Sequence, residues 1–176
     1  MYFDLVRVGG LIYGFAYDYP NSLDLKPVLT YRTRVGQVKT LPAGWGIGYD
    51  LEHVVQQPTR VALLPLGWAD VVGSTHVGNV SFLVRGQWAR LVGICTDFAM
   101  LDVTDLPEVA VGDEVILIGE QDGKRQTVMQ LAKAGKVSTS QLLGRTALRV
   151  PRVYLQNGQP QCELSILSPA PVEMHK

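Results

Sequence analysis

The stretch from Gly44 to Asp105 decides the fold, because it holds the densest group of polar residues between apolar runs. A glycine-rich turn, Gly44-Trp45-Gly46-Ile47-Gly48, leads directly into Tyr49. One apolar run ends at Pro65-Leu66-Gly67-Trp68-Ala69-Asp70, and the next carries Gly93-Ile94-Cys95-Thr96-Asp97. Sites are usually built from polar side chains at the ends of buried strands, so we expect a site here.

Short segments rich in β-branched and apolar residues dominate the chain from Lys26 onward. We expect helices only at 127–134 and 138–144, where a threonine and a serine are placed to cap the first turn. Strands are expected at 28–38, 59–66, 80–84, 89–94, 98–103 and 114–118, with hairpin corners at 111–115, 119–124 and Asn157-Gly158. This spacing predicts a β-barrel or a β-sandwich.

Composition excludes several classes of protein. Sixteen basic residues balance sixteen acidic ones among 176 residues, so no basic field is present to gather nucleic acid or an anionic membrane. No apolar run approaches the ~20 residues of a spanning helix and no secretory leader opens the chain, which predicts a cytoplasmic protein. The three histidines, His53, His76 and His175, lack the spacing of metal ligands, and we expect them to be solvated loop residues. The two cysteines, Cys95 and Cys162, are too few and too far apart for a zinc cluster.

Seven motifs run through most of the chain: Leu25-Lys26-Pro27-Val28-Leu29, Arg34-Val35-Gly36-Gln37-Val38-Lys39, Gly48-Tyr49, Pro65-Leu66-Gly67-Trp68-Ala69-Asp70, Val92-Gly93-Ile94-Cys95-Thr96-Asp97, Asp102-Val103-Thr104-Asp105 and Arg149-Val150-Pro151-Arg152-Val153-Tyr154. In identity and spacing they resemble the carboxy-terminal domain of alanine racemase, a pyridoxal-phosphate enzyme that interconverts L- and D-alanine. The resemblance implies a mainly β fold, a closed Greek-key β-barrel with two short helices. It also implies a dimeric isomerase that supplies D-alanine for peptidoglycan.

The resemblance divides the chain into four parts. Residues 1–16 resemble the last strand and phosphate loop of the racemase's (β/α)₈ barrel, and 17–25 are expected as a linker. Residues 26–168 are expected as the β-barrel domain and 169–176 as a frayed tail. From the residues alone, 2–7 is expected to be a strand. Residues 1–16, without the barrel that they would complete, are expected either to pair as an edge strand or to mediate dimerisation.

The resemblance also assigns the cofactor contacts of the first segment. The arginine matching Arg7 contacts the pyridine nitrogen, and the backbone at Gly9 and Gly10 meets the phosphate; without the resemblance, this glycine pair reads as a flexible turn. A complete barrel takes roughly 250 residues, and no lysine of this chain has the surroundings of the family's Schiff-base lysine. We therefore expect no racemase activity from the chain alone.

Tyr49 is the candidate catalytic residue. A racemase needs acid/base groups on both faces of the α-carbon, and the resemblance implies that a barrel lysine serves one face and Tyr49 the other, across a subunit interface. By the same resemblance Trp68 lies at the cofactor phosphate, and the Thr96 amide faces the substrate carboxylate. The residues alone leave open that Tyr49 is a packed aromatic; we expect it to be surface-accessible in the isolated domain.

Four positions near this site depart from the family's pattern. Asp50 replaces a glycine and opposes use of the neighbouring phenol as a base, Trp68 replaces a tyrosine, Gly93 an arginine and Leu148 a tyrosine. Two functional classes remain. One is part of an alanine-racemase-type enzyme completed by another copy or by a barrel-bearing chain, and the other is a non-catalytic assembly or binding module with a degenerate site.

The remaining charged residues of the motifs are interpreted as structural. Asp97, Asp102 and Asp105 alternate with apolar residues, so turn and cap roles are favoured over an acidic catalytic cluster. Arg149 and Arg152 are expected to pair with the aspartate motifs.

Overall fold

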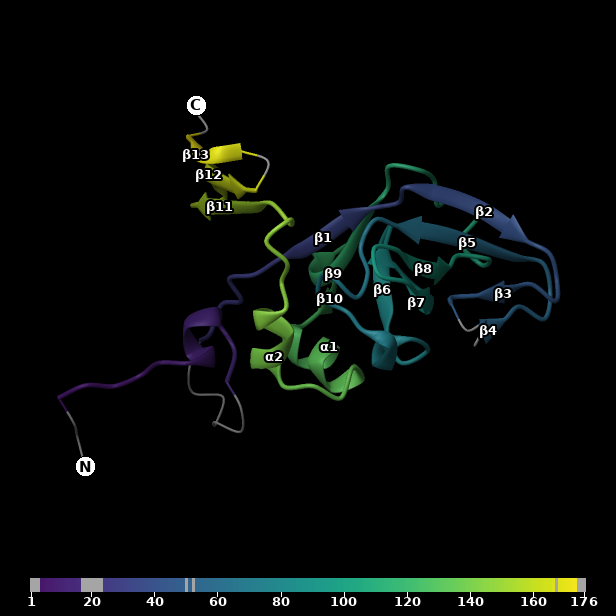
Figure 1. Cartoon of the computed structure of the whole chain (residues 1–176). Helices are drawn as coiled ribbons and strands as arrows, with labels where there is room; N and C mark the ends of the chain where they lie inside the picture. Colours follow the sequence, from purple (N-terminus) through teal and green to yellow (C-terminus); the bar gives the residue numbers. More distant parts are fainter. Residues whose placement is uncertain (1–3, 17–23, 50, 52, 167, 174–176) are drawn as a thin grey trace.

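The computed structural model describes residues 4–16, 24–49, 51, 53–166 and 168–173. Its centre is an antiparallel sheet in the order β1-β9-β6-β7-β8-β5-β2, with β10 paired to β9 (Figure 1). The strands of this sheet are β1 (Tyr31–Arg34), β2 (Gln37–Leu41), β5 (Thr59–Leu64), β6 (Ser81–Val84), β7 (Gln87–Ile94), β8 (Ala99–Asp102), β9 (Glu114–Gln121) and β10 (Lys124–Gln126). The prediction of a mainly β fold is confirmed.

Four successive strands have the Greek-key arrangement. Strands β6, β7 and β8 follow one another as antiparallel neighbours, and β9 returns to lie beside β6. Between β1 and β2 the chain changes its pairing partner, because the Val35 amide donates to Asp113 O at 2.9 Å and the Gly36 amide to Leu63 O at 2.8 Å. The expected strand at 28–38 is therefore divided. The pairings of the described residues form an open path from β1 to β2, so closure of the barrel stays a prediction.

Both predicted helices are present. Helix α1 (Val128–Ala134) is capped by Thr127 and α2 (Thr139–Gly144) by Ser138, each in a capping box with the glutamine three residues later. Short 3₁₀ turns, η1 (Gly10–Tyr13) and η2 (Ser74–His76), complete the helical elements of the described residues. None of these helices is long and apolar enough to span a membrane.

Two of the three predicted hairpin corners are confirmed. Asp122 and Gly123, with φ of 49° and 75°, join β9 to β10, and Asn157 and Gly158, with φ of 52° and 75°, join β11 to β12. The corner at 111–115 is wrong. That segment turns into β9, which pairs with β1 and β6 and makes no hairpin with β8.

The end of the chain forms a separate three-stranded sheet of β11 (Arg152–Gln156), β12 (Gln159–Ser165) and β13 (Ser168–Glu173). It projects from the main sheet (Figure 1). The expected tail from residue 169 is wrong as far as Glu173, because this segment pairs with β12. Residues 174–176 lie outside the described residues.

The first segment differs from the expected strand over its described part. Residues 5–9 form no strand, and η1 follows them. Leu5 and Val6 are 82% and 72% exposed. A parallel barrel strand needs neighbouring strands to pair with, and no described residue supplies one. Residues 1–3, and residues 17–23 of the expected linker, lie outside the described part of the chain.

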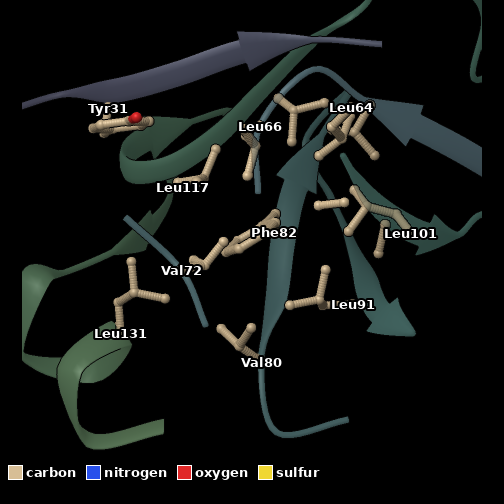
Figure 2. Close-up of a cluster of buried hydrophobic side chains, with 14 of the residues drawn as sticks. Tyr31, Leu64, Leu66, Val72, Val80, Phe82, Leu91, Leu101, Leu117 and Leu131 are labelled. Atoms are coloured by element: carbon tan, nitrogen blue, oxygen red, sulfur yellow. The ribbon is translucent and has the colours of Figure 1, made fainter. Parts of the chain in front are cut away.

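The core fills the space between the main sheet and α1 (Figure 2). Fully buried Phe82, Leu91, Leu101 and Leu117 come from four strands, and Leu131 comes from α1. A second, smaller cluster of Ile47, Val55, Val61 and Val92 joins the hairpin of β3 (Gly46–Ile47) and β4 (His53–Val54) to the sheet. This cluster positions the candidate site.

Candidate functional site

Tyr49 is presented by a hairpin that is anchored to the sheet. Ile47 of β3 is buried to 3% exposure, whereas Tyr49, two residues later, is 64% exposed. Gly48 between them has a φ of 85°, a left-handed conformation that favours glycine. The expectation that Tyr49 is surface-accessible is confirmed, and the packed-aromatic alternative does not hold.

Three of the predicted site residues lie together although they come from distant segments. The Tyr49 ring lies 5.5 Å from the Trp68 ring, centroid to centroid, at an interplanar angle of 47°. The Tyr49 hydroxyl lies 3.5 Å from Thr96 Oγ1. The roles predicted for these residues are not tested by their proximity alone.

A small cavity opens beside Tyr49. Its volume is about 250 Å³, and its lining residues are Ile47, Gly48, Tyr49, His53, Trp68, Ser74, Val77, Val92, Gly93 and Ile94. Neither lysine nor arginine is among these residues. The cavity therefore offers a phenol and an imidazole to a ligand, but no permanent cation to hold an anionic group.

Gly93 fits this cavity only because it lacks a side chain. A Cβ at this position would lie 2.2 Å from Ile47 Cγ2, well inside van der Waals contact. The arginine expected from the family's pattern therefore requires the Ile47 side chain or the β3 hairpin to shift. The glycine at position 93, which departs from the family's pattern, leaves room for the side chain of Ile47.

A charged clamp holds the segments that carry Trp68 and Thr96. Arg149 donates from Nε to Asp70 Oδ1 at 2.8 Å and from a terminal nitrogen to Asp70 Oδ2 at 2.7 Å, and its other terminal nitrogen lies 3.1 Å from Asp97 Oδ1. Asp70 is 2% exposed. The hydrogen bond to Asp70 raises the pKa of Arg149, which keeps the guanidinium charged. The prediction that Arg149 pairs with the aspartate motifs is confirmed.

The backbone completes the same connection. Trp68 N–H donates to Cys95 O at 3.0 Å, and Ala69 N–H donates to Thr96 O at 3.1 Å. A Cβ on Gly67 would lie 2.2 Å from Cys95 O, so only glycine permits this approach. Together the clamp and these bonds fix the position of Trp68 relative to Thr96.

Arg152 and Asp102 have local roles. Arg152 donates to Thr146 O at 3.2 Å and is in none of the ion pairs of the described residues, so its expected pairing with the aspartate motifs is wrong. Asp102 Oδ1 accepts from Thr104 N–H at 2.9 Å and from Thr104 Oγ1 at 2.6 Å, so its predicted turn role is confirmed.

One histidine differs from the expectation of solvated loop residues. His76 is 1% exposed, and its Nδ1 accepts from Gly73 N–H at 3.0 Å. The imidazole lies against Gly135, where an added Cβ would come within 2.2 Å of Nε2. His76 thus packs η2, whose Ser74 lines the cavity, against the end of α1. Burial lowers the pKa of His76.

The other predicted site residues lie elsewhere. Arg7, Gly9 and Gly10 belong to the N-terminal segment, at the opposite end of the molecule from β3 and β4 (Figure 1). Leu148 is 71% exposed and does not line the cavity. Asp50 lies outside the described residues. Of the predicted site residues, the structure therefore brings together Tyr49, Trp68 and Thr96.

Comparison with known proteins decides the family. The family model described as "Alanine racemase, C-terminal domain" matches residues 28–154. The chain belongs to this family. Alanine racemase 2 of Caldanaerobacter subterraneus subsp. tengcongensis is 36% identical over 164 residues, which cover 90% of this chain and 42% of the relative. The alanine racemase of Halothermothrix orenii is 39% identical over 154 residues, covering 86% of this chain and 41% of that one.

Solved structures of alanine racemases agree with this family assignment. The enzyme of Bacillus anthracis with bound L-Ala-P matches with a TM-score of 0.80 at 25% identity, over 89% of this chain and 41% of that one. The enzyme of D-cycloserine-producing Streptomyces lavendulae matches with a TM-score of 0.77 at 34% identity, over 88% and 42%. This alanine racemase C-terminal domain thus spans about two fifths of the length of such relatives.

The residues of the domain do not by themselves fit pyridoxal phosphate. No lysine or arginine is among the described residues that line the cavity beside Tyr49, and the segment with the predicted cofactor contacts Arg7, Gly9 and Gly10 lies at the far end of the molecule. No group of three or more His, Cys, Asp or Glu side chains among the described residues is arranged to hold a metal ion either. A pyridoxal-phosphate pocket beside Tyr49 therefore requires a cation other than the described residues of this cavity.

Proposed function

We propose that this domain supplies one half of an alanine racemase active site, with Tyr49 as the acid/base group for one face of the α-carbon. The other half is a lysine-bearing barrel with bound pyridoxal phosphate, on another copy or on a partner chain. The product, D-alanine, serves peptidoglycan synthesis in the cytoplasm. When bound, this cofactor acts as the electron sink that makes the α-proton removable.

The exposure of Tyr49 is the observation that carries this proposal. An acid/base group must come within about 3 Å of the proton that it transfers. A 64% exposed phenol, held by a hairpin whose Ile47 is buried, meets the condition for reaching a substrate outside its own domain. The hydroxyl lies 3.5 Å from Thr96 Oγ1, a contact at the surface of the domain.

The positive charge that a tyrosine base needs has to come from the barrel. A free tyrosine titrates near pH 10, so a tyrosine base needs a cation nearby at neutral pH. Among the described residues that line the cavity there is neither a lysine nor an arginine. In our proposal Arg7, Gly9 and Gly10 contact the cofactor once residues 1–16 form part of a barrel. The domain itself closes into a barrel through the chain that continues from β1 into β2.

The packing of Gly93 favours the second candidate, a non-catalytic assembly module. In the present packing Ile47 Cγ2 occupies the space that a side chain at position 93 would need, and Trp68 has no phenolic hydroxyl. In this alternative the exposed aromatic residues around the cavity bind a partner chain without chemistry.

Complementation tests the proposal. The domain is mixed with the separately purified barrel segment of the Halothermothrix orenii enzyme and pyridoxal phosphate, and D-alanine formed from L-alanine is measured. We expect activity only in the mixture, a loss of about 100-fold or more with Tyr49→Phe, and full activity with the control Tyr154→Phe, which changes a 48% exposed tyrosine on β11. Complex formation without activity would support the assembly module, and the absence of a complex would refute the half-site.

A further inference from the structure

Thr96 and Asp97 are neighbours in the turn at 95–98 that joins β7 to β8, and their side chains have different partners. Thr96 Oγ1 lies 3.5 Å from the Tyr49 hydroxyl, whereas Asp97 Oδ1 lies 3.1 Å from a terminal nitrogen of Arg149. The turn is closed by a hydrogen bond from Cys95 N–H to Phe98 O at 2.6 Å. Because the backbone has only two soft dihedral angles per residue, the positions of Thr96 and Asp97 are coupled.

A second turn, at 67–70, lies against the first. Trp68 N–H donates to Cys95 O at 3.0 Å, and Ala69 N–H donates to Thr96 O at 3.1 Å. These two bonds lie beyond the end of the β5–β8 ladder, which stops at the pair Leu64 and Ala99. The side chains of Trp68 and Asp97 are 46% and 54% exposed. Backbone bonds at such an exposed edge open locally at a low free energy unless other contacts hold them.

The guanidinium of Arg149 spans both turns. It is oriented by two hydrogen bonds to Asp70 of the second turn, at 2.8 and 2.7 Å, and Asp70 is 2% exposed. Asp70 also accepts from Gly67 N–H at 2.9 Å. Because the guanidinium is planar and rigid, two bonds to one carboxylate fix the direction of the remaining nitrogen. That nitrogen meets Asp97 of the first turn.

The Asp97 carboxylate does little for the stability of its own turn. None of the hydrogen bonds of the described residues joins it to the backbone of this turn. It differs in this respect from Asp102, whose carboxylate accepts from Thr104 N–H. Its ion pair with Arg149 joins side chains that are 54% and 41% exposed, and ion pairs this exposed contribute little to the free energy of unfolding. The effect left to Asp97 is to hold one turn against the other.

We propose that Asp97 is a positioning residue of the half-site. Through Arg149 it holds the turn at 95–98 against the turn at 67–70, and so keeps Thr96 and Trp68 in place beside Tyr49, whose ring centroid lies 5.5 Å from that of Trp68. The role rests on the proposed racemase function. A misplacement of about 1 Å can cost about 100-fold in rate, so the loss of Asp97 acts on kcat more than on KM.

Hydrogen exchange of the backbone amides, measured by NMR on the full chain, tests the positioning role. The variant is Asp97→Ala, and its matched control is Asp105→Ala, which removes an exposed aspartate that is in none of the ion pairs of the described residues. In Asp97→Ala we expect about tenfold faster exchange at Trp68 and Ala69. Exchange at Leu91, whose N–H donates to Val80 O at 3.0 Å in the core, should stay unchanged. The control should change none of the three.

The same variants are then mixed with the barrel segment of the Halothermothrix orenii enzyme and pyridoxal phosphate. Asp97→Ala should lower kcat about tenfold and leave KM within about twofold, and Asp105→Ala should change neither. Unchanged exchange at Ala69, or equal acceleration at Ala69 and Leu91, would overturn the positioning role whatever the activity. Faster exchange at Ala69 with an unchanged kcat would overturn its part in the reaction and leave the role of Tyr49 standing. A mixture that is inactive even with the wild-type domain would refute the half-site, and the part of Asp97 in the reaction with it.

Discussion

Removing the guanidinium of Arg149 should destabilise the domain by an amount that the geometry sets. In Arg149→Leu the Asp70 carboxylate, 2% exposed, loses two charge-assisted hydrogen bonds of 2.8 and 2.7 Å and keeps the Gly67 N–H at 2.9 Å. Leaving one partner of a buried ion pair unpaired costs about 3–5 kcal/mol. The Arg149 side chain is 41% exposed, so in the variant water partly replaces the lost hydrogen bonds to Asp70. We therefore expect the free energy of unfolding to fall by about 2–3 kcal/mol.

Urea unfolding followed by circular dichroism measures this cost. The matched control is Arg125→Leu, which breaks an ion pair with Glu120 whose side chains are 55% and 49% exposed; its cost should stay below about 1 kcal/mol. Asp97→Asn removes only the exposed arm of the clamp and should cost about 0.5 kcal/mol. Equal costs for Arg149→Leu and Arg125→Leu would refute the reasoning that the clamp is a buried interaction.

Two further predictions concern the surroundings of the cavity at Tyr49. Burial lowers the pKa of His76 below 6.5, so its contribution to stability should be complete above about pH 6.5 and fall as the pH drops toward the folded-state pKa; unfolding midpoints between pH 8 and 5 should show this fall in wild type and lose it in His76→Gln. In the same assay Gly93→Arg should lower the free energy of unfolding by about 1–3 kcal/mol, because its Cβ would meet Ile47 Cγ2 at 2.2 Å. The double variant with Gly93→Arg and Ile47→Ala should cost less than the sum of the two single variants. Purely additive costs would contradict this packing account.

The sequence predicts most strands and both helices because these features are local. Strand-length apolar runs and the caps at Thr127 and Ser138 are visible within a few residues. The partner change at Val35 and Gly36 is not visible in this way, since it depends on Asp113 and Leu63, far along the chain. The two-residue strands of β3 and β4 are too short to show a period.

The candidate site was predicted only in part for the same reason. Tyr49, Trp68 and Thr96 stand in motifs, and the resemblance assigns them to one site. Burial of His76 has no local signal, because α1 covers it from a distant part of the chain. The cavity residues Ser74 and Val77 likewise belong to no motif, and their loop is positioned by tertiary packing.

Stereochemically resolved exchange tests the central claim most directly. In deuterated solvent, exchange of the α-hydrogen is measured by NMR for L-alanine and D-alanine separately, in the mixture of this domain with a lysine-bearing barrel. The account predicts that Tyr49→Phe abolishes exchange starting from one enantiomer and preserves it from the other, with assembly intact. Equal loss for both enantiomers, or unchanged exchange for both, would contradict an acid/base role of Tyr49 on one face of the α-carbon.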